Sequence, residues 1–241
     1  MNKAETILKL RKDISSFEGM HALNSDSLDK ALWFFRDAFP NGKFPLGCVH
    51  EFLAFNPEDM SASRGFISSI LSQLLSEKKM AVWISNKQNH FPAALRKFAL
   101  SPEQLLFVVH NNEKELLWVA EEFLKYNQLS ALVAEFRSLD FTTSRRFQLA
   151  VEKSKVTAFV LRTDASKIVS NSSVSRWQVK SIPSGSYNDL PGISFPSWNV
   201  ELQRMRNGKA FSIDIECRSG ILSPANQPAA IIIQSPQKAV G

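Results

Sequence analysis

The sequence contains few of the residues on which disulfides, metal sites and membrane spans depend. It has two cysteines among 241 residues, Cys48 and Cys217, and no second pair of ligands accompanies them, which excludes a disulfide framework and a cysteine zinc site. No run of residues approaches the ~18 apolar side chains that a membrane-spanning helix requires. The first residues also lack the apolar core of a secretion signal. We therefore expect a cytoplasmic protein that binds no metal and does not enter a membrane.

Basic residues are present but are unevenly distributed. The formal net charge is +6, yet residues 1–140 contain 16 Lys and Arg against 17 Asp and Glu, whereas residues 141–220 contain 12 against 6. Such an asymmetry indicates an acidic partner, for which nucleic acid and an acidic protein surface are the usual candidates. The alternative is a basic face that is solvated and has no partner.

Short apolar runs alternate with segments of helical periodicity through most of the chain. The runs are continuously apolar, which is typical of a parallel sheet that is buried on both faces. The sequence predicts an α/β protein with an N-terminal helical segment at 1–39, a core at 40–218 and a flexible tail at 219–241. The expected strands are 49–55, 80–85, 105–110, 131–136 and 157–163, and the expected helices are 3–15, 26–38, 65–77, 92–99, 112–125 and 142–153.

The pattern changes after residue 163. Residues 164–173 are small, polar and turn-prone, which predicts a mobile loop before a strand at 174–183. The dipeptide Asn207-Gly208 separates two alternating runs at 197–206 and 209–217, and Asn-Gly is the strongest short-range signal for a hairpin. The C-terminal part of the core is therefore expected to carry antiparallel strands.

Residues 56–64 occupy the position at which a phosphate-binding loop would connect the first strand to the next helix. Such a loop needs glycines whose N–H groups surround the anion, a lysine for the terminal phosphates and a Ser or Thr hydroxyl for magnesium. The segment contains Pro57, Glu58 and Asp59 and has no Gly-Lys-Ser/Thr, and its two acids would repel a triphosphate. The layout of a nucleotide-binding module is thus predicted without its phosphate chemistry.

The order of parallel core, polar loop and Asn-Gly hairpin resembles the RecA-type ATPase core. Four segments make the resemblance more specific: FPLGCVHEFL at 44–53, EFRSLDFTTSRRFQLA at 135–150, SRWQV at 175–179 and WNVELQRMRNG at 198–208. On these segments the chain resembles the ImuA proteins, RecA-like accessory factors of bacterial error-prone translesion synthesis. The resemblance covers about residues 40–217, and it implies a RecA-like, SulA-related three-layer α/β/α core with a mostly parallel central sheet.

The resemblance also implies a degenerate nucleotide site. Residues 62–64 read Ala-Ser-Arg where RecA proteins have Gly-Lys-Thr. Residues 85–87 contain no water-activating glutamate, and Thr163 replaces a phosphate-sensing glutamine, so that only Glu135 remains near the place of the acid that supports magnesium. Because hydrolysis needs these groups together, we expect no catalytic residue and no cofactor, with ATP binding without hydrolysis left open. The residues expected at this site are Asn56, Ser63, Arg64 and Glu135.

Basic residues beside the polar loop and the hairpin are expected to form a binding surface. Arg204 and Arg206 should share one strand face, where they would supply charge for the phosphates of single-stranded DNA. Trp177 and Trp198 could stack on bases, although burial in the core is the more common place for such side chains. The expected DNA- or partner-binding residues are Arg145, Arg146, Lys167, Arg176, Lys180, Arg204, Arg206 and Lys209.

Arg145 and Arg146 lie on the first turn of the helix expected at 142–153, where at least one of them should face solvent. Contact with DNA or with an acidic partner is one interpretation. The other is an ion pair with Asp140 or Glu152.

The resemblance implies a non-hydrolysing accessory protein of SOS-induced mutagenic translesion DNA synthesis that acts by binding. Its implied partners are an inactive Y-family polymerase of the ImuB type, a replicative-type error-prone polymerase, RecA and single-stranded DNA. Two alternatives are an active or weak RecA-family ATPase with a degenerate phosphate loop, and a simple single-stranded DNA-binding module.

Overall fold

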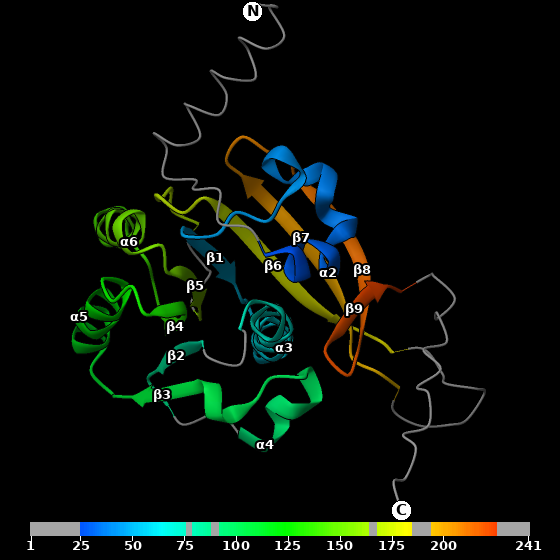
Figure 1. Cartoon of the computed structure of the whole chain (residues 1–241), viewed down its shortest axis with the longest axis horizontal. Coiled ribbons are helices and arrows are strands. Elements are labelled where there is room, and N and C mark those ends of the chain that lie inside the picture. The colour runs from blue at the N-terminus through cyan, green and yellow to red at the C-terminus, as the bar shows by residue number, and fades with distance from the viewer. Residues whose placement is uncertain (1–24, 76–78, 88–91, 164–167, 185–193, 226–241) are drawn as a thin grey trace, which may run out of the picture.

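One continuous sheet organises the residues that the structure, a computed structural model, describes: 25–75, 79–87, 92–163, 168–184 and 194–225 (Figure 1). The strands are β1 (Val49–Leu53), β2 (Met80–Ser85), β3 (Leu105–Val109), β4 (Leu129–Phe136), β5 (Thr157–Arg162), β6 (Ser175–Ile182), β7 (Ser197–Met205), β8 (Phe211–Arg218) and β9 (Ile221–Pro224). The α-helices are α2 (Asp26–Ala31), α3 (Pro57–Leu74), α4 (Pro92–Leu95), α5 (Glu113–Leu124) and α6 (Phe141–Ser154). Short 3-10 helices are η1 (Trp33–Ala38), η2 (Pro40–Gly42), η3 (Arg96–Phe98) and η4 (Pro102–Gln104).

The sheet has a parallel part and an antiparallel part. Its strand order is β3-β2-β4-β5-β1-β6-β7-β8-β9. The first six strands in this order pair in parallel, and β7, β8 and β9 are added in antiparallel register. The prediction of an α/β protein with a mostly parallel sheet and an antiparallel C-terminal end is confirmed.

Continuously apolar strands allow helices to cover both faces of the parallel part. In Figure 1, α5 and α6 lie together on one side of the sheet and α3 lies on the other. One core, which contains Phe52, Trp83 and Trp177, forms on the α3 side. A second core, which contains Val82 and Leu132, forms on the side of α5 and α6. The two cores explain why β1 and β5 are buried along their whole length.

Residues 56–64 do not form the expected loop, because they are the cap and the first two turns of α3. Asn56 caps the helix, and its side-chain oxygen accepts a hydrogen bond from the N–H of Asp59 at 2.7 Å. Pro57 at the first helical position has no N–H to leave unsatisfied, and the acids Glu58 and Asp59 complement the helix dipole. These helix-start signals are visible in the sequence, and the prediction of a loop there is wrong.

The described end segments pack into the core. The helix expected at 26–38 is divided into α2 and η1, and Leu28, Leu32 and Phe35 are almost fully buried there. At the other end, β9 occupies the first part of the predicted tail, because Ser219 and Gly220 adopt positive φ angles of 50° and 83° and reverse the chain. Residues 1–24 and 226–241 lie outside the described part.

Trp177 and Trp198 are core residues. Trp177 is fully buried and stacks on Phe52, with ring centroids 5.9 Å apart and planes inclined by 8°. Trp198 is also buried, and it lies so close to Gly65 that a Cβ there would come within 2.7 Å of the indole ring. Neither ring is therefore free to stack on a base.

His50 connects β1 to the chain that precedes it. Its Nδ1 lies 2.6 Å from the Ser175 hydroxyl and its Nε2 lies 2.8 Å from the Pro45 carbonyl oxygen. Burial lowers the pKa of His50 to about 4, and the bond to Pro45 opposes that shift. The imidazole is therefore a neutral core side chain at pH 7.

Membrane-spanning helices are not found in the described parts of the chain, because none of the helices there combines the required length with sufficient apolar character.

Candidate functional site

The edge of the sheet at which β1 ends is the expected place of a nucleotide. Residues 54–56 alone connect β1 to α3, so no loop is available to surround a phosphate group. A helix N-terminus ordinarily attracts anions, but here its first turn carries Glu58 and Asp59. This edge therefore has neither the backbone cradle nor the charge that a triphosphate requires.

Arg64 and Glu135 meet at this edge and neutralise each other. Arg64 Nε lies 2.9 Å from Glu135 Oε1, and Arg64 Nη2 lies 2.6 Å from Glu135 Oε2. Trp83 Nε1 also donates to Glu135 Oε1, at 3.0 Å. The Glu135 side chain is 3% exposed and that of Arg64 is 20% exposed. Both carboxylate oxygens thus have donors, and the pair occupies the place expected for a magnesium-supporting acid.

The other two residues expected at the nucleotide site belong to the structure of α3. Asn56 caps α3, and Ser63 is fully buried within that helix, where its hydroxyl has no hydrogen-bond partner among the described residues. The described part of the chain also contains no group of three or more His, Cys, Asp or Glu side chains that could hold a metal ion. Of the predicted site, the structure brings together only Arg64 and Glu135.

A second ionic cluster lies in the interior around Glu51 on β1. Glu51 Oε1 accepts a hydrogen bond from Arg162 Nη1 at 3.0 Å, and Oε2 accepts one from Arg176 Nε at 2.6 Å. The side chains of Glu51, Arg162 and Arg176 are 0%, 3% and 11% exposed. We did not predict Glu51 or Arg162 as functional residues. The available signal was a single charge inside each of two apolar strands, because such charges must be paired when they are buried.

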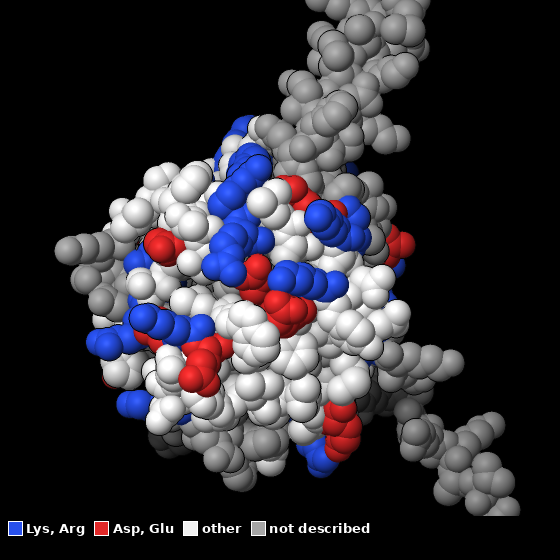
Figure 2. Space-filling model, turned by 90° about the vertical axis from the view of Figure 1, so that its left-hand side faces the viewer, with Lys and Arg blue, Asp and Glu red and all other residues white. Residues whose placement is uncertain are grey.

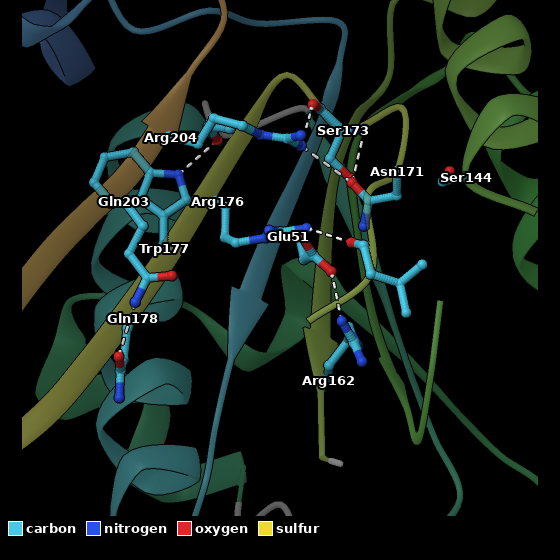
Figure 3. A network of polar contacts seen from close by, with 12 residues as sticks. Glu51, Ser144, Arg162, Asn171, Ser173, Arg176, Trp177, Gln178, Gln203 and Arg204 are labelled. Atoms are coloured by element: carbon cyan, nitrogen blue, oxygen red, sulfur yellow. Dashed lines mark hydrogen bonds and ion pairs between the residues drawn. The ribbon is translucent and has the colours of Figure 1, made fainter. Parts of the chain in front are cut away.

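Three arginines fasten residues 168–174, called the strap from here on, to the sheet, and Figure 3 shows two of them, Arg176 and Arg204. Each guanidinium donates to a main-chain carbonyl oxygen of the strap, and the N–H of Ser172 donates to the hydroxyl of Ser144 on α6 at 3.0 Å. The strap contacts are Arg176 Nη2 to Val169 O (2.7 Å), Arg204 Nη2 to Ser173 O (2.9 Å) and to Asn171 Oδ1 (3.1 Å), and Arg206 Nη2 to Ser172 O (3.2 Å).

A β-bulge gives Arg204 its direction. Arg176 pairs with Arg204, but the next residue, Trp177, pairs with Leu202, so that Gln203 is the extra residue. Without the bulge, alternation would place Leu202 and Arg204 on the same face of β7. Instead Leu202 is buried and Arg204 is directed toward the strap. Burial lowers the pKa of Arg204, and the nearby charge of Arg176 lowers it further.

The expected basic strip is only partly available at the surface. Arg176 is buried and binds Glu51 and the strap, which removes it from the proposed DNA surface. Arg204 and Arg206 are half-buried. Lys180 is paired with Glu201 at 2.6 Å, and Lys209 is exposed beside the hairpin. Lys167 lies outside the described residues.

The two arginines of α6 have different surroundings. Arg146 forms an ion pair with Glu121 of α5, which neither of the two interpretations of Arg145 and Arg146 had named. Asp140 instead caps α6, because its Oδ1 accepts a hydrogen bond from the N–H of Thr143 at 2.7 Å. Arg145 is exposed and has no ion pair within the described chain. The outer face of α6 thus retains unneutralised basic charge.

Comparison with known proteins identifies two curated relatives. No protein-family model matches the chain. "Protein ImuA" of Caulobacter vibrioides strain NA1000 / CB15N and that of strain ATCC 19089 / CIP 103742 / CB 15 are each 33% identical to it over 183 residues, which is 71% of this chain and 75% of each relative. The crystal structure of SulA from Pseudomonas aeruginosa aligns with a TM-score of 0.41 at 15% identity, over 47% of this chain and 96% of SulA.

Proposed function

Because the chain belongs to the ImuA family, we propose that it is a non-hydrolysing accessory protein of SOS-induced mutagenic translesion DNA synthesis. It acts in the cytoplasm by binding other macromolecules. The proposed protein partners are an inactive Y-family polymerase of the ImuB type, a replicative-type error-prone polymerase and RecA. Single-stranded DNA is the proposed nucleic-acid partner. Family membership supports the pathway, and the geometry at the end of β1, where a nucleotide was expected, supports action by binding.

The closed pair of Arg64 and Glu135 is the observation that carries the proposal. Magnesium needs carboxylate or phosphate oxygens that it can coordinate in an octahedral arrangement. Both oxygens of Glu135 already accept hydrogen bonds, two of them from the guanidinium of Arg64. Opening this site for magnesium would leave the Arg64 charge in place beside the metal. The alternative of an active ATPase is therefore disfavoured, because phosphoryl transfer depends on metal, cradle and base acting together.

A direct contact with single-stranded DNA is supported by the exposed end of the β7–β8 hairpin. Lys209 is exposed there and Arg206 is half-exposed, so their charges can reach a phosphate backbone. Arg176 and Arg204 contribute mainly by holding the strap in place. The proposed DNA surface is thus smaller than the basic residues of the sequence indicated.

The proposed pathway is tested in a strain that lacks the gene. Exposure to ultraviolet light should induce far fewer mutations in this strain than in its parent, whereas the spontaneous mutation rate should stay the same. A plasmid that encodes the wild-type chain should restore the induced mutations. If the deletion leaves the induced mutation frequency unchanged, the proposed role in mutagenic synthesis is wrong.

A further inference from the structure

A groove between α5 and α6 is a surface feature that the proposed nucleotide and DNA positions do not use. It consists of two hollows of about 330 Å³ and 230 Å³. Both hollows are lined by Glu121 and Arg146, so the ion pair between these two residues crosses the groove in the middle. We call these two hollows together the α5–α6 groove.

The charged lining of the α5–α6 groove is predominantly basic. Lys114, Lys125, Arg146 and Lys153 line it, against the single acid Glu121. Arg146 and Lys125 both pair with Glu121, which neutralises that acid. The side chains of Lys114 and Lys153 are exposed and have no acidic partner within the described chain. In Figure 2 this side of the molecule faces the viewer, and its Lys and Arg side chains form a column that Asp and Glu interrupt.

Apolar side chains form the rim of the groove. Trp118 on α5 is 62% exposed and Leu149 on α6 is 44% exposed. An exposed tryptophan beside a hollow is the type of residue that anchors a protein partner, because its ring buries a large area at little cost in side-chain entropy. The groove thus combines an apolar anchor with basic flanks.

The α5–α6 groove has the length and shape to accommodate a third helix. The lining residues 114, 117, 118 and 121 of α5 follow the i, i+3, i+4, i+7 pattern of one helix face, and residues 143, 146, 147 and 150 of α6 do the same. One face of each helix therefore borders the groove. Helices of 12 and 14 residues are about 18–21 Å long. A third helix of similar length can therefore lie along both.

We propose that the α5–α6 groove binds an acidic amphipathic helix of a partner protein. The apolar stripe of that helix packs on Trp118 and Leu149, and its acidic side chains reach Lys114 and Lys153. The inference deepens the proposed function and rests on it for the class of partner, because the groove gives an accessory protein a place to hold one of its protein partners.

Other occupants do not match the groove as well. Residues 1–24 contain four basic and three acidic side chains, and residues 226–241 contain only Lys238, so neither end of the chain is acidic. A second copy would present the same basic lining and would be repelled. A phosphate backbone would meet the basic flanks but would give Trp118 and Leu149 no apolar contact. An acidic amphipathic helix satisfies both, because it carries an apolar stripe beside its acidic side chains.

The partner is captured with a photo-crosslinking residue in the full chain. Benzoylphenylalanine replaces Trp118 in one strain and Leu149 in a second, and cells are irradiated after DNA damage. We expect mass spectrometry to find the crosslink in a protein segment that has net negative charge and helical apolar spacing. Changing Lys114→Glu and Lys153→Glu together should reduce the crosslink yield at least fivefold. The matched control, Lys43→Glu with Lys97→Glu, changes two exposed lysines elsewhere and should leave the yield unchanged.

The outcomes of this experiment separate the groove from the pathway. A crosslink to nucleic acid, to a second copy or to either end of the same chain overturns the inference, and so does the absence of a crosslink at both positions. An acidic helix from a protein outside mutagenic DNA synthesis would support the groove and contradict the proposed function. A normal crosslink combined with unchanged mutation frequency in the deletion strain would do the same.

Discussion

Basic side chains that pair with buried acids and basic side chains on α5 and α6 differ in what neutralises them. Arg64 and Arg162 each bind a carboxylate that is almost completely buried, whereas Lys114 and Lys153 have no acidic partner within the described chain. A positive charge therefore neutralises a buried carboxylate in one region, whereas in the other region it is available to bind a partner. Burial, and not the number of basic residues, separates the two roles.

The two groups of basic side chains differ because removing a charge from water costs free energy. A buried carboxylate is stable only when its oxygens are paired and hydrogen-bonded, so Glu51 and Glu135 form ion pairs with the arginines that lie near them. An exposed lysine has no such requirement, because water solvates it. The basic excess of residues 141–220 is thus partly structural, and the outer face of α6 keeps the rest.

The largest effect that tests this contrast is expected from Glu51→Gln. The substitution leaves Arg162 and Arg176 buried without an acid, and we expect the free energy of unfolding to fall by about 4 kcal/mol. Urea unfolding measures the change. The control is Glu122→Gln, which removes an exposed acid that pairs with Lys125, and it should cost less than about 0.5 kcal/mol. If both variants lose the same free energy of unfolding, the buried and the exposed acid do not differ in their contribution to stability.

A smaller loss is expected from Arg64→Ala. It leaves the buried Glu135 without its counter-charge and should lower the free energy of unfolding by about 3 kcal/mol. Combining it with Glu135→Gln should recover more than half of this loss, because the uncompensated charge is then absent. Phosphate release from ATP with single-stranded DNA should stay at background for the wild-type chain. Turnover that Arg64→Ala abolishes would show that the pair is a working part of an ATPase.

The smallest change in stability is expected from Lys209→Ala, which tests an exposed basic residue and not one that pairs with a buried acid. Lys209 is exposed, so the free energy of unfolding should change by less than about 0.5 kcal/mol. Binding to single-stranded DNA should lose about 0.7 from its slope of log affinity against log salt, since one phosphate contact is removed. Lys97→Ala is the matched control, with an exposed lysine far from the hairpin in sequence. Identical slopes would exclude Lys209 from the DNA surface.

Local signals predicted the elements well where a single principle was decisive. Apolar runs predicted the parallel strands, and Asn207-Gly208 predicted the hairpin between β7 and β8. The loop expected at 56–64 failed because the template of a phosphate loop was given more weight than the cap at Asn56 and the proline after it. β9 was missed because a four-residue strand is too short to show a period.

The candidate sites were predicted less well, because pairing between distant residues has no local signal. Arg64 and Glu135 were both predicted, but their mutual contact spans 71 positions of the chain. Glu51 lies 111 positions from Arg162 and 125 positions from Arg176. Of the predicted binding residues only Arg146 lines the α5–α6 groove, since its other wall belongs to α5.

The sequence by itself determined the family, the alternation of strands and helices, and the absence of a Gly-Lys-Ser/Thr cradle, because each of these is a property of neighbouring residues. Only the tertiary structure decided which arginines pair with a buried carboxylate and which basic side chains have no acidic partner within the described chain. That outcome depends on whether a folded chain brings a buried acid within hydrogen-bond distance. Arg176 forms such an ion pair with Glu51, whereas Lys153 remains exposed on the α5–α6 groove.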